Sequence, residues 1–304
     1  MPRLTRRQTL TAGAALPLAA LAPAAQADAP MLGADFAMHR RFTLGGFEVT
    51  TLLVGTSPAN DLQSIFGMNV SAEEFAEVSA ANFISPDQAQ FFFTPTVINT
   101  GADLVLFDTG LNAAGTTGAL AAAGYTPDQI DLVVLTHMHG DHIGGMLSDG
   151  PPTFPNARYA TGRVEYDAWA AAGNDGFNQN VRPFADQMTF LEDGQEAASG
   201  LTAMAAFGHT PGHMVYRIES QGEGLVLFAD LANHPIWSLA RPDWEVRFDM
   251  DKEAAAASRR RVLSMIAAER LPAIGYHMPF PALGYVATDG DGFRWVPEAG
   301  QLMG

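Results

Sequence analysis

The sequence stands out for what it lacks: its 304 residues include no cysteine, a single lysine (Lys252) and no long apolar run. Without cysteine the chain forms no disulfide, so its stability has to come from other sources, above all a buried core. Without an apolar run of about 18 residues, no membrane span is expected in the mature chain. The length and the 47% hydrophobic content predict a globular protein with one domain.

Basic residues are also scarce. Asp and Glu number 33 against 17 Lys and Arg, which gives a formal net charge of -16 at pH 7. The acids are scattered along the chain rather than gathered in a tail. Such a surface repels nucleic acid and anionic lipid, because both carry negative charge. We therefore expect no nucleic-acid partner.

Residues 1–27 have the pattern of a cleaved export signal. Arg3, Arg6 and Arg7 give a basic start, a mildly apolar stretch follows, and an Ala-x-Ala-like site ends at Ala27. The paired arginines in TRRQTL resemble a twin-arginine signal, which predicts a periplasmic or secreted protein. A membrane anchor is the alternative, and the short stretch rich in Ala and Pro disfavours it. Residues 28–304 then form a single domain.

Strand and helix patterns alternate along this domain. A Ser71/Glu74 capping box predicts a helix within an insertion at residues 57–95. Alternation of short apolar strands with amphipathic helices predicts a layered α/β fold. Other predicted segments are helices over 163–172 and 251–269 and a loop-rich stretch over 173–186.

The segment HMHGDH concentrates three of the eight histidines. In an extended segment residues two apart share a face, so His137 and His139 should point the same way. Gly140 then permits a turn that places Asp141 and His142 at the start of a helix. Imidazole and carboxylate ligands together suit Zn²⁺, and also Mn, Fe or Co. Two exposed histidines and a capping aspartate are the non-functional alternative.

Three more candidate ligands lie beside apolar strands. His213 closes GHTPGH, Asp230 ends LVLFAD and His277 ends AIGYH. In layered α/β folds, side chains at strand ends gather along one sheet edge, where ligand sites form. His209, which opens GHTPGH, is expected to be a hydrogen-bonding partner rather than a ligand. Seven ligands are thus expected to converge on one cleft: His137, His139, Asp141, His142, His213, Asp230 and His277.

The segments HMHGDH, GHTPGH, FAD and YHMPFP, in this order and spacing, resemble the metallo-β-lactamase superfamily. The resemblance implies an αββα sandwich, in which two mixed β-sheets are flanked by helices, with a binuclear metal site at one edge of the sheets. It also implies two divalent ions, with Asp230 bridging them. By residue type and order, one ion is held by His137, His139 and His213, and the other by Asp141, His142 and His277.

Within that superfamily, TPGH, QGEGLVLFAD and HMPFPALGYV are similar to the methyl parathion hydrolase and lactonase branch. Two departures count against a specialised organophosphate hydrolase. The turn after FDTG is short and lacks an aromatic residue, and ADLANHPIW carries polar residues where that enzyme is apolar. The resemblance thus implies a lactonase or arylesterase with phosphotriesterase activity as a further property; an organophosphate hydrolase is the alternative.

Two adjacent cations explain a hydrolytic activity. They share a bridging water and lower its pKa from near 15.7 towards about 7, which supplies hydroxide at neutral pH. One ion also polarises the substrate oxygen and offsets the negative charge of the transition state. Asp141, a ligand able to hydrogen-bond that water, is the predicted proton shuttle to the leaving group.

Aromatic residues near the ligands are the candidate pocket walls, with ordinary core positions as the alternative for each. His234, four residues after Asp230, is placed by a turn at the rim of the cleft or else on the surface. No lysine or arginine lies in these segments, so neutral hydrophobic lactones or aryl esters, such as acyl homoserine lactone or dihydrocoumarin, fit better than phosphate monoesters. The candidate walls are Phe91, Phe92, Phe93, Trp169, Phe177 and Phe280.

Two other functions compete with this hypothesis. The same fold serves β-lactamases, which generally lack a bridging carboxylate such as Asp230, and glutathione-thioester hydrolases, which need cationic residues near the site. A non-catalytic exported protein that uses its metals only as a structural staple belongs to a different class. Structural sites tend to be closed and often use cysteine, whereas seven N and O ligands leave room for water. The insertion at 57–95 serves either as a substrate lid or as the contact of a homodimer.

Overall fold

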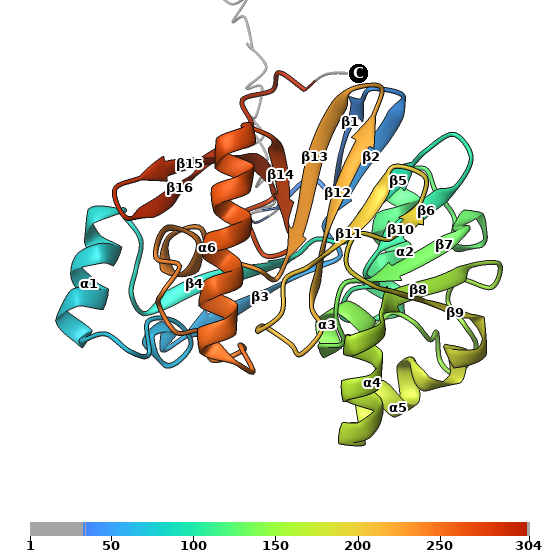
Figure 1. The fold of residues 1–304 in the computed structure, drawn as a ribbon, viewed down its shortest axis with the longest axis horizontal. Coiled ribbons are helices and arrows are strands. Elements are labelled where there is room, and N and C mark those ends of the chain that lie inside the picture. Colours follow the sequence, from blue (N-terminus) through green and yellow to red (C-terminus); the bar gives the residue numbers. More distant parts are fainter. Residues whose placement is uncertain (1–32, 34, 303–304) are drawn as a thin grey trace, which may run out of the picture. The chain divides into compact units, whose positions relative to one another are not determined.

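Two seven-stranded β-sheets form the centre of the fold in the computed structural model (Figure 1). The structure describes Gly33 and residues 35–302, so the predicted export signal at 1–27 lies outside the described residues. The first sheet contains, in spatial order, β1 (His39–Leu44), β2 (Phe47–Leu52), β5 (Thr96–Asn99), β6 (Leu104–Phe107), β7 (Leu132–Leu135), β8 (Arg158–Gly162) and β9 (Met188–Leu191). The neighbouring strands β1, β2, β5 and β6 pair antiparallel, whereas β6, β7, β8 and β9 pair parallel, so the sheet is mixed.

The second sheet is also mixed, because β13 and β14 pair parallel while their neighbours pair antiparallel. The β13–β14 connection contains the helix α6 (Lys252–Glu269), as a parallel crossover requires. Its strands, in spatial order, are β10 (Glu196–Ala198), β11 (Leu201–Ala205), β12 (Met214–Ser220), β13 (Glu223–Ala229), β14 (Pro272–Gly275), β15 (Leu283–Asp289) and β16 (Gly292–Pro297).

The main core lies between the two sheets, and strand alternation explains how it is filled. Along β7, Leu132 and Val134 belong to the cluster shared with the second sheet. Val133 and Leu135 belong to a second cluster on the outer face of the first sheet. Successive side chains of a strand point to opposite faces, so a wholly apolar β7 serves both layers.

Helices cover the outer faces of both sheets. On the first sheet lie α2 (Ala113–Ala122), α3 (Gly140–Ile143), α4 (Arg163–Ala172) and α5 (Asp175–Asn180), and α6 packs on the second. The order helix, sheet, sheet, helix confirms the predicted αββα sandwich. The predicted bounds of α4 and α6 hold, and Asp251 caps α6 by accepting a hydrogen bond from Ala254 N at 3.0 Å. No described helix has both the length and the hydropathy to cross a membrane.

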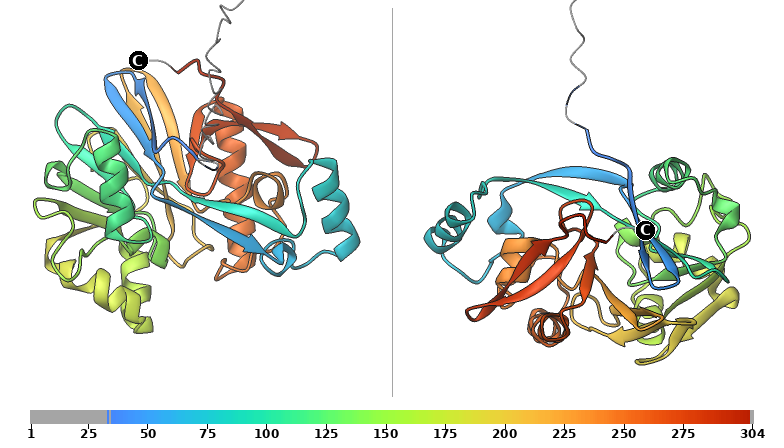
Figure 2. Two further views of the ribbon diagram at one scale, coloured as in Figure 1. Left: turned by 180° about the vertical axis from the view of Figure 1, so that it is seen from behind. Right: turned by 90° about the horizontal axis from the view of Figure 1, so that it is seen from above.

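The insertion is a hairpin that carries a helix. Strands β3 (Gly55–Asn60) and β4 (Gln88–Phe93) pair antiparallel, and α1 (Ala72–Ala81) lies between them in the chain. Helix α1 starts where predicted, because the Ser71 side chain accepts from Glu74 N at 3.1 Å. Figure 2 shows α1 at the opposite end of the sheets from α4 and α5. A third apolar cluster, which includes Phe66, Phe75 and Trp237, holds the insertion against the domain.

The prediction of loop structure over 173–186 is wrong in part. Helix α5 and the 3₁₀ helix Arg182–Gln187 occupy most of this stretch. Asn174 caps α5 by accepting a hydrogen bond from Phe177 N. The segment is rich in polar residues, and for this reason its sequence resembles a loop rather than a helix. Phe177 and Phe184 are buried, so the segment closes the outer core of the first sheet.

Candidate metal centre

The loop after β7 has the geometry that its sequence predicts. The Nε2 atom of His137 and the Nδ1 atom of His139 lie 3.1 Å apart, so both rings point to the same side. His139 is the N-cap residue of α3, which places Asp141 and His142 in the first turn of that helix. Two pairs of potential ligands therefore leave one turn of chain.

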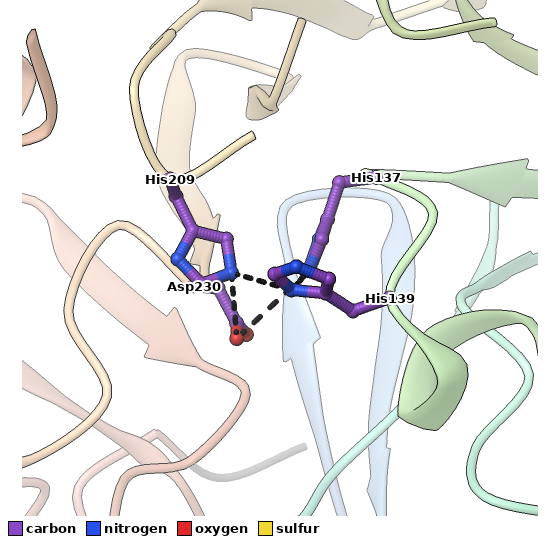
Figure 3. Close-up of side chains that lie close together, drawn as sticks. All are labelled: His137, His139, His209 and Asp230. Atoms are coloured by element: carbon purple, nitrogen blue, oxygen red, sulfur yellow. Dashed lines mark hydrogen bonds and ion pairs between the residues drawn. The ribbon is translucent and has the colours of Figure 1, made fainter. Parts of the chain in front are cut away.

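Four side chains from three strand ends form a first group: His137, His139, His209 and Asp230 (Figure 3). Their candidate ligand atoms all lie within 4.8 Å of one another. His209 Nε2 is 3.0 Å from His139 Nδ1 and 3.3 Å from Asp230 Oδ2. Ligands about 2.0–2.1 Å from a tetrahedral Zn²⁺ are about 3.3 Å apart, so these distances fit a metal ion among them.

A second group, Asp141, His142 and His277, lies on the other side of Asp230. His277 Nε2 is 3.3 Å from Asp141 Oδ2 and 3.1 Å from Asp230 Oδ2. His142 Nε2 is 3.2 Å from Asp230 Oδ1. The Asp230 carboxylate thus contacts members of both groups, which is the position of a bridging ligand.

Two buried atoms of this centre, His142 Nε2 and Asp230 Oδ1, face each other at 3.2 Å without the geometry of a hydrogen bond, and neither has another partner among the described residues. Their residues are 0% and 3% exposed, so bulk water does not satisfy these atoms. Buried polar atoms without partners are rare because each costs about 1–3 kcal/mol. A cation that accepts lone pairs from both atoms removes this cost, so the residues fit a binuclear metal site.

The far side of each outer imidazole is fixed by a hydrogen bond. His142 Nδ1 donates to Asp108 Oδ2 at 2.9 Å, and His277 Nδ1 donates to the Phe92 carbonyl at 2.8 Å. His209 Nδ1 donates to Asp249 Oδ1 at 2.9 Å. Each bond sets the tautomer and turns Nε2 towards the centre, as partners of metal-bound histidines do. Through Phe92 the inserted hairpin orients a ligand.

Burial and the neighbouring charged groups shift the pKa values of the histidines in this centre. Burial by itself lowers the pKa of His209, but hydrogen bonds with Asp230 and Asp249 raise it to about 9. The pKa of His139 falls to about 4, because burial and the neighbouring His209 disfavour its protonated form. Burial also lowers the pKa of His137 well below its ordinary value. In the metal-free protein His137 and His139 are therefore neutral beside an ionised Asp230, whereas His209 is protonated and has to release a proton when it binds a divalent metal.

The structure corrects the assignments of His209 and His213. His213 Nδ1 donates to the Ala206 carbonyl at 3.2 Å, and its Nε2 accepts from Asp230 N at 3.2 Å. Both of its ring nitrogens therefore bind the main chain, and the residue holds the strand ends together. His209 occupies the position among the ligands that was predicted for His213. A consistent use of the strand-end rule finds this, because His209 follows β11 whereas His213 precedes β12.

Glu165 is a buried residue of the site that sequence reasoning missed. Its Oε1 accepts from Met138 N at 2.9 Å, and its Oε2 accepts from Thr210 Oγ1 and Gly212 N, both at 2.8 Å. Burial raises the pKa of this carboxyl, and the three donors oppose the rise. The residue ties together the two loops that carry the three histidines of the first ligand group. In the sequence it resembles an ordinary acid in the first turn of α4.

A cavity of about 440 Å³ opens onto the centre. His139, Asp141, Asp230 and His277 are among its lining residues, so both ligand groups reach it. Its walls are mainly apolar, and strand β4 supplies Phe91 and Phe93 from alternate positions. The remaining lining residues are Ser57, Pro58, Ala59, Ile65, Gly140, Arg247 and Phe248. Arg247 lies outside the predicted wall segments and adds an arginine to the cavity lining.

Three other predicted wall residues are not among those that line the cavity. Phe92 contributes its carbonyl to His277. Trp169 packs edge-on against His139, with ring centroids 5.8 Å apart. Phe280 is half-buried in the segment that follows His277.

Two predicted pocket residues are structural. Phe177 is fully buried in the outer core, where its ring packs against Tyr166. His234 stacks on Trp237 at 4.0 Å, and its Nδ1 accepts from the main-chain N–H groups of Ile236 and Trp237. It therefore caps the π-helical segment Pro235–Ala240 instead of lying at the cleft rim. Burial lowers the pKa of His234 to about 3, consistent with a neutral acceptor.

This chain is similar in sequence to known lactonases and similar in fold to solved structures. An N-acyl homoserine lactonase of Bacillus cereus is 28% identical over 152 residues, which span 50% of this chain and 57% of the relative. A solved structure of AidC, described as a dizinc quorum-quenching lactonase in complex with a product, is 27% identical with a TM-score of 0.78. That match covers 86% of this chain and 97% of AidC.

A second solved structure, of the hydrolase AbOPH in the beta-lactamase superfamily, is 25% identical with a TM-score of 0.79, over 87% of this chain and 99% of that protein. The family model for the metallo-beta-lactamase superfamily matches residues 94–273. This range holds every member of the first ligand group and most of both sheets. The chain thus belongs to the metallo-beta-lactamase superfamily.

Proposed function

We propose that the protein is a binuclear metal-dependent hydrolase of hydrophobic lactones and aryl esters. The observation that carries the proposal is the joint presence of two ligand groups, with Asp230 between them, at a cavity with mainly apolar walls. The similarity to an N-acyl homoserine lactonase and to a dizinc lactonase supports a cyclic ester as substrate. Divalent ions held here, with Zn²⁺ as the expected metal, would supply an activated water and polarise the scissile carbonyl.

The chain's own residues perform the remaining steps. Phe91 and Phe93 bind the apolar part of the substrate, because burying their exposed ring surface is favourable. Asp141 is the carboxylate with the greater access to the cavity, since 22% of its side chain is exposed against 4% for Asp230. Its position lets Oδ2 accept a proton from the attacking water and return it to the leaving oxygen. The Asp141 main chain is fixed through Tyr276, whose hydroxyl donates to its carbonyl at 2.5 Å.

A substrate panel tests this proposal. Metal-loaded protein is assayed with N-hexanoyl-homoserine lactone, dihydrocoumarin, methyl paraoxon, nitrocefin and S-lactoylglutathione. We expect turnover of the first two that disappears on chelation and in His142→Asn, while His39→Asn, on the edge strand β1, keeps full activity. The absence of metal-dependent turnover on lactone and aryl ester alike rejects the proposal. Turnover restricted to paraoxon favours an organophosphate hydrolase, and chelation that unfolds an inactive protein favours a structural staple.

We also propose that residues 1–27 direct export and are removed. The basic start and the site at Ala27 support this. Mass spectrometry of the protein recovered outside the cytoplasm should give a mature chain that begins at residue 28.

A further inference from the structure

Arg247 is the single arginine or lysine among the residues that line the cavity. Its main chain is fixed against the inserted segment, because Arg247 N donates to the Ile65 carbonyl at 2.8 Å and Val246 pairs with Phe66 in an antiparallel bridge. Ile65 itself lines the cavity. The base of the arginine is therefore held at the wall even though its side chain is exposed.

The guanidinium has no carboxylate partner among the described residues. Five other arginines of the same part of the chain do form ion pairs with Asp or Glu: Arg40, Arg158, Arg217, Arg259 and Arg260. The guanidinium of Arg247 instead lies over the ring of Phe248, 5.2 Å from its centroid. This contact takes up no carboxylate, so the N–H donors of the guanidinium stay available to an oxygen acceptor.

A ligand that covers Arg247 must replace the water on those donors. A purely apolar ligand leaves the charge unpaired, which is unfavourable, whereas an oxygen acceptor forms a charge-assisted hydrogen bond. An anionic ligand is disfavoured, because the whole chain carries a formal charge of -16 and repels anions as they approach the cavity. A neutral carbonyl oxygen meets both conditions.

We propose that Arg247 is a specificity-determining residue that selects substrates with a second, neutral carbonyl remote from the scissile ester, such as the amide of an acylated amino lactone. This inference rests on the proposed function, and it names the substrate class within it. Plain alkyl lactones of similar size enter the same cavity without that hydrogen bond and are hydrolysed less efficiently.

Two substrates and three variants test the inference. N-hexanoyl-homoserine lactone carries the second carbonyl, and γ-decalactone lacks it. Arg247→Met keeps an unbranched stem and removes the charge, and Arg247→Lys keeps the charge without the planar fork. Arg241→Met is the matched control, because Arg241 is an exposed arginine six positions earlier that lines a different groove.

In Arg247→Met we expect KM for the amide-bearing lactone to rise about tenfold with kcat unchanged, the lower end for a hydrogen bond to a charged group. The value for γ-decalactone should stay within twofold, Arg247→Lys should be intermediate, and Arg241→Met should match the unmodified protein on both substrates. Equal changes on both lactones, or none on either, overturn the inference while leaving the proposed function intact. Failure of the unmodified protein to hydrolyse either lactone rejects the proposed function, and this inference with it.

Discussion

The substitution Glu165→Gln tests whether Glu165 holds the two ligand-carrying loops in place or is only a buried acid of the core. The carboxylate accepts three hydrogen bonds with two oxygens, from Met138, Thr210 and Gly212. A glutamine amide has one oxygen and one NH₂ group, so at least one of these donors must face another donor. If the amide oxygen stays on the side of Thr210 and Gly212, the orphaned group is the N–H of Met138.

The magnitude follows from the number of orphaned donors. One buried donor without a partner costs about 1–3 kcal/mol, so the free energy of unfolding of the metal-free protein should fall by that amount. Met138 lies between His137 and His139, and its displacement also moves two ligands. We therefore expect the affinity for metal to fall about 10- to 100-fold, as happens when a hydrogen bond behind a ligand is removed.

Urea denaturation of the metal-free protein measures the first quantity, and competition with a chromophoric chelator measures the second. Asp167→Asn is the control, because Asp167 is an exposed acid two positions later on the same helix. A loss of stability with unchanged metal affinity would refute the clamp and leave a structural role. Unchanged values of both quantities would refute the hydrogen-bond count itself.

Three further predictions concern the ligands and the ions. Asp249→Asn should lower metal affinity about 10- to 100-fold, because its NH₂ group must face either His209 or Arg259; competition titration measures this, and an unchanged affinity contradicts the proposed orientation of His209. His209→Ala should reduce the bound metal from two ions to about one by elemental analysis, whereas His213→Ala should lower the unfolding free energy more than the metal content; the opposite pattern restores His213 as the ligand. Removal of metal by dialysis against a chelator should lower the melting temperature, since ions at about 100 to 1,000 times Kd stabilise a folded protein by about 3–4 kcal/mol; an unchanged melting temperature argues against metal in the native protein.

Local patterns predicted those parts of the site that a short segment builds by itself. The turn from His137 to His142 needs only the two-residue period of an extended chain, a flexible Gly140 and a helix start. The capping of α1 by Ser71 and of α6 by Asp251 is local in the same way. In each case the interacting groups are within six residues, so the sequence order already brings them together.

The choice between His209 and His213 could not be settled by composition. Both flank the same Pro-Gly turn, and both lie at the edge where β11 and β12 meet. Their order along the chain favours His209, which follows β11, over His213, which precedes β12. The direction of each ring in the structure then decides between them, since His209 faces the Asp230 carboxylate and His213 binds the main chain of that residue.

The sequence alone predicted the superfamily, the two-sheet sandwich and six of the seven side chains that the structure brings together at the candidate metal centre, because motif order and hydrophobic periodicity follow directly from the order of residues along the chain. Only the tertiary structure decided that Glu165 joins two loops, that Phe92 orients His277, and that Arg247 reaches the cavity wall. Glu165 and its partner Met138 are 27 positions apart in the chain, and His277 and Phe92 are 185 positions apart. Their partners are set by how the sheets and the insertion pack, which no local pattern records.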